Sequence, residues 1–221
     1  MSRLPQDKII MSQQPDTRHK REKERGGKDF NQACAILDDA NICHVGFTLD
    51  DIPYVVPMAC ARHDKNLLLH GSIASRLMKS LANGLNCCAT VTHLDGMVYA
   101  RSAFNSSMNY RSVMVFGKAR LVDDADEKSE SFDVLVEHLM PGRLADIRPS
   151  TRKELNATHL LALPIQTFTT KIRTGPPDDP TVDLDQPVWA GDVPYLHTVN
   201  KAITSPDMRF EIPVPDYLKS N

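Results

Sequence analysis

Alternating hydrophobic and polar positions dominate the middle of the chain. Short runs of this kind are typical of β-strands, above all where Asp, Asn, Gly and Pro separate them. Five such runs are predicted as strands: residues 42–49, 52–60, 66–70, 87–94 and 112–121. Residues 97–103 are predicted to add another strand after an Asp95-Gly96 turn, and residues 160–172 return to strand character. Six short strands with one internal helix, at residues 75–82, predict an antiparallel barrel and not a βαβ sheet.

Helical spacing of apolar residues marks the segments around these strands. Residues 29–40 and 123–140 carry apolar side chains three and four positions apart, which predicts two amphipathic helices. Thr151 and Glu154, a hydroxyl and an acid three residues apart, predict a short helix that starts near residue 150. The fold class expected from the pattern is therefore mainly β with flanking helices.

Both ends of the chain lack this patterning. Residues 1–28 are polar and charged, which predicts a disordered tail, since acidic residues interrupt its basic run. Residues 29–175 are expected to form one domain. Residues 176–221 are rich in Pro and Asp, and we expect an extended arm that packs on the barrel or on a dimer partner.

Composition and charge narrow the choice of function. A formal net charge of −2 over 221 residues gives no electrostatic case for nucleic acid or for an anionic membrane surface. No apolar run reaches the roughly 18 residues that span a bilayer. Five cysteines without a CxxC pair favour a reduced, cytoplasmic location. Cys34, Cys43, His44 and Cys60 lack ligand spacing, so we predict no metal site.

The stretch LLLHGSIASR, residues 67–76, carries the clearest chemical signal. A strand ends at His70-Gly71-Ser72, and Ser75-Arg76 open a helix. Hydroxyls, free backbone N–H groups and a guanidinium at a helix start suit a bound phosphate, and small residues such as Gly71 let a ligand approach the backbone. Ser75 could equally be an ordinary helix cap, so the stretch alone leaves both interpretations open.

Five motifs in one order extend this signal over most of the chain. They are PYVVPM (53–58), LHGSIASR (69–76), MNYRSVMVFGKA (108–119), KIRTGPP (171–177) and PVWAG (187–191). In this order they resemble the flavin-nucleotide-binding proteins of the pyridoxamine 5′-phosphate oxidase-like superfamily, near the nitroimidazole-reductase branch. The resemblance implies a six-stranded antiparallel Greek-key split β-barrel and a homodimer, with one FMN in each of two clefts between the subunits.

The resemblance also implies which residues hold the cofactor. In the family, the second strand lies against the isoalloxazine ring, the turn after the third strand holds the phosphate, and later strands reach the flavin across the interface. The residues at these positions are Val56, Pro57, Met58, His70, Gly71, Ser72, Ser75, Arg76, Tyr110, Arg111, Ser112, Lys171, Arg173 and Trp189. Leu77 stands where the oxidases carry a lysine, so the phosphate would have one cation fewer.

Several of these residues also have a plain structural interpretation. A cation at Arg111 would raise the flavin's potential, but a strand-end arginine can instead pair with a surface carboxylate. Lys171 and Arg173 share one face of a strand, which a solvated surface would explain equally well. Trp189 could pack on the flavin or serve packing alone. His70 could donate a proton to a reduced substrate, or it could simply pack.

These expectations together predict an FMN-dependent oxidoreductase. Electrons would pass from a reduced nicotinamide donor through FMN to a small, flat acceptor. The alternative is a non-catalytic carrier or sensor of flavin, haem or F420. A divergent pyridoxamine 5′-phosphate oxidase is disfavoured, because Tyr195 stands where the oxidases carry an arginine ahead of the histidine retained as His197.

Overall fold

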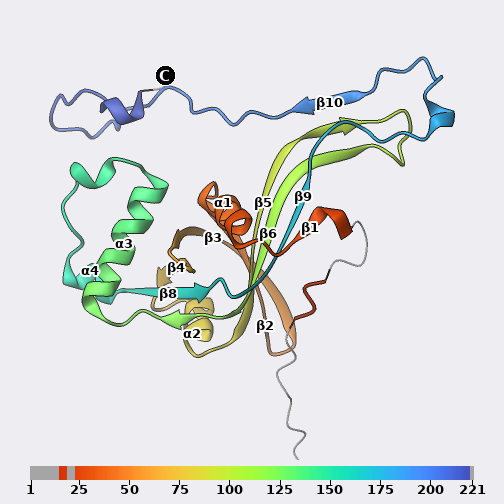
Figure 1. Cartoon of the computed structure of the whole chain (residues 1–221). Coiled ribbons are helices and arrows are strands. Elements are labelled where there is room, and N and C mark those ends of the chain that lie inside the picture. Colours follow the sequence, from red (N-terminus) through yellow and green to blue (C-terminus); the bar gives the residue numbers. More distant parts are fainter. Residues whose placement is uncertain (1–14, 19–22, 220–221) are drawn as a thin grey trace, which may run out of the picture.

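The computed structural model describes residues 15–18 and 23–219, and in them a single curled antiparallel sheet forms the body of the molecule (Figure 1). Its strands follow the order β1-β9-β6-β5-β2-β3-β4-β8-β7, and β10 pairs with β5 beside that path. The bounds are β1 Gly26–Gly27, β2 Ile42–Leu49, β3 Ile52–His63, β4 Asn66–Ser72, β5 Asn86–Tyr99, β6 Ser107–Lys118, β7 Arg120–Leu121, β8 Thr158–Pro164, β9 Thr167–Arg173 and β10 Gly191–Pro194.

The sheet curls because two strands that follow each other directly in the chain lie at distant positions in the sheet. Strands β6 and β7 are separated only by Ala119, yet β6 lies between β5 and β9 while β7 ends the sheet beside β8. The mainly β, half-barrel architecture confirms the predicted fold class. Its interior holds the main apolar core, to which alternate residues of β2, β4, β5 and β8 contribute, such as Val45, Leu67, Leu69 and Leu161.

Four α-helices flank the sheet in the described part of the chain. They are α1 Phe30–Asp38, α2 Arg76–Ala82, α3 Ala125–Leu139 and α4 Arg152–Asn156. Each starts at a side-chain cap, provided by Asp29, Ser75, Asp124 and Thr151. The predicted helices are thus confirmed, with α4 closed by the capping box expected at Thr151 and Glu154. Helix α3 covers a second apolar cluster, on the outer face of β4 and β8.

Three strand predictions differ from the structure in detail. The Asp95-Gly96 pair is not a turn but a bulge within the continuous strand β5. Glycine is required there because a Cβ on Gly96 would lie 2.6 Å from the carbonyl oxygen of Val193 in β10. Residues 160–172 form not one strand but two, β8 and β9, which are separated by a turn just after Pro164. The two strands do not pair with each other, because β8 lies beside β4 and β7 while β9 lies beside β6 and β1. The described part of the chain therefore has ten strands and not six; three of them, β1, β7 and β10, have four residues or fewer.

The described segments on both sides of the barrel domain each pair with the sheet. The last residues of the predicted tail are ordered, since Gly26 and Gly27 pair with Lys171 and Thr170 of β9; residues 1–14 and 19–22 lie outside the described residues. The predicted C-terminal arm is extended and pairs through β10 with the outer part of β5. It then runs across the molecule toward the end of α3 (Figure 1), where the Tyr217 hydroxyl donates to Asp146 at 2.5 Å.

No helix in the described part of the chain is long and apolar enough to cross a membrane.

Candidate functional site

The second strand presents an open backbone edge where the sequence predicts contact with a ring. Residues 52–59 of β3 pair with β2, whereas only residues 60–63 pair with β4. Beyond the Cys60–Leu69 pair, β4 continues beside β8 alone. One edge of the PYVVPM segment, which includes Val56, Pro57 and Met58, therefore has no ladder partner among the described residues. Backbone donors and acceptors on that edge are available to a planar ligand.

The turn between β4 and α2 carries two serine hydroxyls whose O–H groups are free to donate a hydrogen bond. The Ser72 Oγ atom accepts a hydrogen bond from the N–H of Ala74 at 3.1 Å, and the Ser75 Oγ atom caps α2 by accepting from the N–H of Met78 at 3.4 Å. Neither hydroxyl donates to an acceptor in the described part of the protein. Because a hydroxyl can accept and donate at once, the cap and an anion contact are compatible.

Arg76 is an exposed cation without a carboxylate partner among the described residues. Its guanidinium carbon lies 4.8 Å from the centroid of the Tyr54 ring, a cation–π contact that joins α2 to the PYVVPM strand. Helix α2 has only seven residues, so its dipole is short and the guanidinium would supply most of the attraction for an anion. Tyr54 was not predicted as a site residue, because a single sequence gives no signal that it lies opposite the cation of the next motif.

Two residues of the same turn serve packing. A Cβ on Gly71 would lie 2.9 Å from the Cγ atom of Met78, so glycine here lets α2 pack closely against β4. Leu77, at the oxidases' lysine position, is buried in the main core. The turn thus presents a single arginine and two hydroxyls, as the sequence predicted.

His70 lies at the end of β4 with an imidazole that has no hydrogen-bond partner in the described part of the protein. Its Nδ1 atom is buried and unpaired, and its ring contacts Phe132 of α3 edge to face, with the centroids 5.9 Å apart. Burial lowers the pKa of His70. The ring is therefore neutral at neutral pH, which weighs against the predicted role as proton donor and suits a role as an electron-pair donor.

Arg111 is engaged by two carboxylates of its own chain. Its Nε and Nη2 atoms donate to the two oxygens of Asp95 at 3.0 Å each, and Nη1 donates to Asp39 at 2.6 Å. These hydrogen bonds raise the pKa of Arg111 further above its already high value. The alternative left open by the sequence, pairing with a carboxylate, is what the chain shows, and contact with a flavin across an interface stays a prediction.

Arg173 is a buried structural residue in this chain. Its guanidinium donates to the side-chain oxygen of Asn109 at 2.6 Å and to the carbonyl oxygens of Gly175 and Pro176 at 3.1 and 3.2 Å. It thereby fixes the turn that leads from β9 into the arm. Lys171, on the same strand face, is half-buried.

The remaining predicted residues lie along the outer sheet. Tyr110 and Ser112 are half-buried on β6, and the Ser112 hydroxyl donates to the carbonyl oxygen of Lys171 at 3.2 Å. Trp189 is 65% exposed and contacts Tyr99, with the ring centroids 5.9 Å apart. An indole this exposed has room to bury itself against a further molecule.

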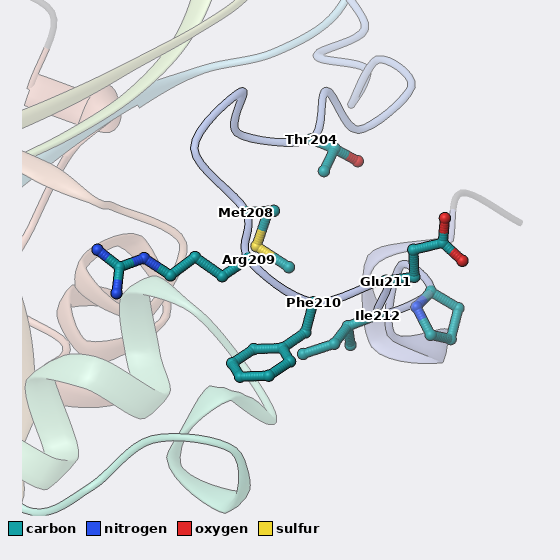
Figure 2. Close-up of a pocket in the computed structure, with 7 residues that line it drawn as sticks. Thr204, Met208, Arg209, Phe210, Glu211 and Ile212 are labelled. Atoms are coloured by element: carbon teal, nitrogen blue, oxygen red, sulfur yellow. The ribbon is translucent and has the colours of Figure 1, made fainter.

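A hollow formed by the C-terminal arm lies away from all these residues. It has a volume of about 590 Å³ and is lined only by the C-terminal arm, from Thr204 to Pro213 (Figure 2). Figure 2 shows Met208, Phe210 and Ile212 extending from the same stretch of chain into open surroundings. A bend in one exposed segment is a poor cofactor site, because no second element fixes its shape.

Comparison with known proteins identifies the family. Residues 29–172 match the sequence model of the family described as pyridoxamine 5′-phosphate oxidase, and the chain belongs to this family. No curated protein matches the chain.

Solved structures add nearer relatives. The flavocytochrome Anf3 from Azotobacter vinelandii is 37% identical over 91% of this chain and 94% of its own, with a TM-score of 0.86. The FAD and heme binding protein from Mycobacterium smegmatis is 36% identical over 87% and 95%, with a TM-score of 0.84. A putative 5-nitroimidazole antibiotic resistance protein from Bacteroides thetaiotaomicron is 25% identical over 66% and 86%, with a TM-score of 0.56.

Proposed function

We propose that this chain is a cytoplasmic, homodimeric flavoprotein that transfers electrons. The flavin phosphate is held by Arg76 with the hydroxyls of Ser72 and Ser75, and the isoalloxazine ring lies along the open edge of β3. One observation carries the proposal: a cation and two O–H donors that have no anionic partner among the described residues stand beside an unpaired strand edge. Two relatives support it, since one is a flavocytochrome and the other an FAD and heme binding protein.

Two forms of the flavin, FMN and FAD, are candidates for the site. FMN is the prediction from the sequence, and no comparison confirms it. The Mycobacterium smegmatis relative is named for FAD, so FAD is the competing form; both carry the same ring and the same first phosphate. Flavin released from the purified protein by heat and separated by chromatography identifies the form.

The proposed dimer would complete the site. Large apolar side chains are exposed on the described surface, including Ile42 and Val55 on the hairpin of β2 and β3 and Trp189 and Val193 around β10. Exposed apolar residues in such number are typical of surfaces that bind another protein. A second copy would cover them and bring its own arm toward the open edge of β3. Light scattering on the purified protein measures the molar mass in solution, which is expected to be twice that of one chain.

The chemistry comes from the cofactor, and the chain supplies its placement. A bound flavin accepts a hydride or two electrons and releases them one or two at a time. Arg76, Ser72 and Ser75 anchor the phosphate end by charge-assisted hydrogen bonds. The backbone of β3 orients the ring. Apolar side chains of the same strand, such as Val56 and Met58, limit the access of water to the ring. We propose a reduced nicotinamide as donor and a small, flat molecule as acceptor.

The proposal is tested by flavin affinity in two matched variants. Arg76→Ala is expected to weaken flavin binding about tenfold to hundredfold, since a charge-assisted contact contributes roughly 1.5–3 kcal/mol. Lys79→Ala removes an exposed cation one turn later in the same helix, and we expect no change in the dissociation constant. Equal binding by wild type and Arg76→Ala would refute the phosphate site. Reduction of the bound flavin by NADH or NADPH under anaerobic conditions then tests electron transfer.

A second cofactor, haem, is favoured by a specific observation. Two relatives above 35% identity are a flavocytochrome and an FAD and heme binding protein. In this chain, His70 offers a neutral imidazole without a competing hydrogen bond among the described residues. Neutral imidazole is a common iron ligand. Haem supplies one-electron chemistry that would allow electrons from a flavin to leave singly.

A further inference from the structure

We infer that Tyr54 is a positioning residue, whose ring holds the Arg76 guanidinium in place to receive the flavin phosphate. Arg76 binds that phosphate in the proposed function, on which the inference rests. Arg76 is exposed and has no carboxylate partner among the described residues, so a group of another kind must keep it at the turn between β4 and α2. Tyr54 provides that support.

The contact with Tyr54 fixes the cation without using its hydrogen-bond donors. The guanidinium carbon of Arg76 lies 4.8 Å from the centroid of the Tyr54 ring. In such a contact the positive charge is attracted to the electron-rich ring, and no N–H group is consumed. The side chain of Arg76 donates no hydrogen bond to any described residue, so its N–H groups stay available as a fork for two phosphate oxygens.

Other arginines of the chain are held by carboxylates instead. Arg62 donates to both oxygens of Asp38 at 2.7 and 2.8 Å. Arg111 donates through all three of its side-chain nitrogen atoms to two carboxylates. A carboxylate occupies donors and cancels the charge that would attract an anion, whereas a neutral ring leaves both intact. The arrangement of Arg76 therefore suits an anion that comes from outside the chain.

The Tyr54 ring is itself fixed to the interior of the barrel. Tyr54 lies directly opposite Phe47 in the ladder between β2 and β3. The two rings stack with their centroids 5.2 Å apart and their planes 15° from parallel. Phe47 is buried in the main core, and Tyr54 packs against that core. A long and flexible arginine side chain thus rests on a partner that has little freedom to move.

The contact also joins the two halves of the proposed flavin site. Tyr54 belongs to the PYVVPM segment of β3, two residues before Val56, along which the isoalloxazine ring is proposed to lie. Arg76 is the first residue of α2, directly after the Ser75 cap. The pair therefore connects the strand that would orient the ring with the turn that would hold the phosphate.

The test is a double-mutant cycle on the full-length protein, with the dissociation constants of FMN and of FAD as readouts. Tyr54→Leu is expected to raise the constant about two- to fivefold, the effect of one exposed cation–π contact. Tyr54→Phe keeps the ring and is expected to bind like wild type. In an Arg76→Ala background, Tyr54→Leu should have no further effect, because the ring then has no cation to hold.

Lys79→Ala provides the matched control background. Lys79 is an exposed cation one turn later in α2. In this background, Tyr54→Leu should weaken flavin binding by the same factor as in wild type. Urea denaturation of each variant checks that it is folded, which separates a loss of binding from a loss of structure.

Nuclear magnetic resonance on the flavin-free protein tests the contact itself. An aromatic ring shifts the signal of a proton above its face upfield, and Arg76→Lys identifies the Nε–H signal of Arg76 by its disappearance. We expect this signal to lie upfield in wild type and in Tyr54→Phe, and at an ordinary position in Tyr54→Leu. It should stay upfield when FMN is added. An ordinary position in wild type, with or without FMN, would show that the ring does not hold the cation and would overturn the inference.

The binding data separate the two proposals. A wild type that binds neither FMN nor FAD refutes the proposed function, and equal binding by wild type and Arg76→Ala refutes its phosphate site; either result also removes the inference. Weaker binding in Arg76→Ala together with unchanged binding in Tyr54→Leu refutes the inference alone. A loss in Tyr54→Leu that is equally large with and without Arg76 marks a structural role of Tyr54, and it overturns the inference as well.

Discussion

Replacement of Arg173 by methionine would tell a structural cation from a cofactor-binding one. The sequence motif KIRTGPP resembles a flavin-contacting segment, yet the structure directs the guanidinium of Arg173 to Asn109 and to the two carbonyl groups that follow β9. We expect Arg173→Met to destabilise the fold and to leave the flavin dissociation constant unchanged.

The magnitude follows from the three hydrogen bonds that are lost. Asn109 is only 8% exposed, and an unpaired buried acceptor costs about 1–3 kcal/mol. The carbonyl groups of Gly175 and Pro176 are nearer to solvent, so water replaces the guanidinium there at about 0.5 kcal/mol each. Burial of the methionine side chain and removal of a buried charge stabilise the folded variant by roughly 1 kcal/mol, which offsets part of this loss. The net loss is about 2 kcal/mol, which lowers the urea midpoint by about 1 M if m is near 2 kcal/mol per M.

Urea denaturation, followed by circular dichroism, measures this loss. Lys171→Met is the matched control, because Lys171 lies on the same strand face and its replacement is expected to cost less than about 0.5 kcal/mol. A stability of Arg173→Met within that margin of wild type would refute the structural role. A flavin dissociation constant that rises as far as in Arg76→Ala would instead return Arg173 to the cofactor site.

Two further predictions concern titratable groups. Burial lowers the pKa of His70, so the unfolded chain takes up a proton first, and the folded state loses stability as the pH falls below about 6.5. Denaturation at a series of pH values should show this loss in wild type and less of it in His70→Gln; equal slopes would contradict the assignment. Among the thiols, Cys43, Cys60 and Cys87 are buried, and burial and Cys88 raise the pKa of Cys87 to about 11. A thiol reagent at pH 8 should find these three unreactive until urea unfolds the chain; rapid modification of more than two thiols in the native state would show that they are accessible.

Local patterns predicted the strands and helices well, and the failures have physical causes. The period of two located β2 at both ends and the first residues of β3 and β4, because one face of each strand lies in the core. β3 and β4 run three and two residues further than predicted. Strand β1 consists of two glycines, which carry no pattern, and it exists only because β9 offers an edge. The Asp95-Gly96 pair has the composition of a turn, but the arm that packs against Gly96 comes from nearly 100 residues later in the chain.

The sequence predicted the part of the candidate site whose residues lie close together along the chain. Ser72, Ser75 and Arg76 fall within five positions, and the structure places them at one turn as expected. The pairing of Arg111 with Asp39 joins residues 72 positions apart, and a single sequence has no signal for it. The same holds for Arg76 and Tyr54, which come together only after β3 and α2 have packed. Contact of Trp189 with a flavin or with a partner subunit stays a prediction.

The central claim is that the flavin's phosphate binds at the turn between β4 and α2. A crystal structure of the protein grown with FMN, and a second with FAD, tests it most directly. We expect a phosphate within hydrogen-bonding distance of the Arg76 guanidinium, with the ring along residues 53–58 of β3. A phosphate bound at any other part of the chain would contradict it.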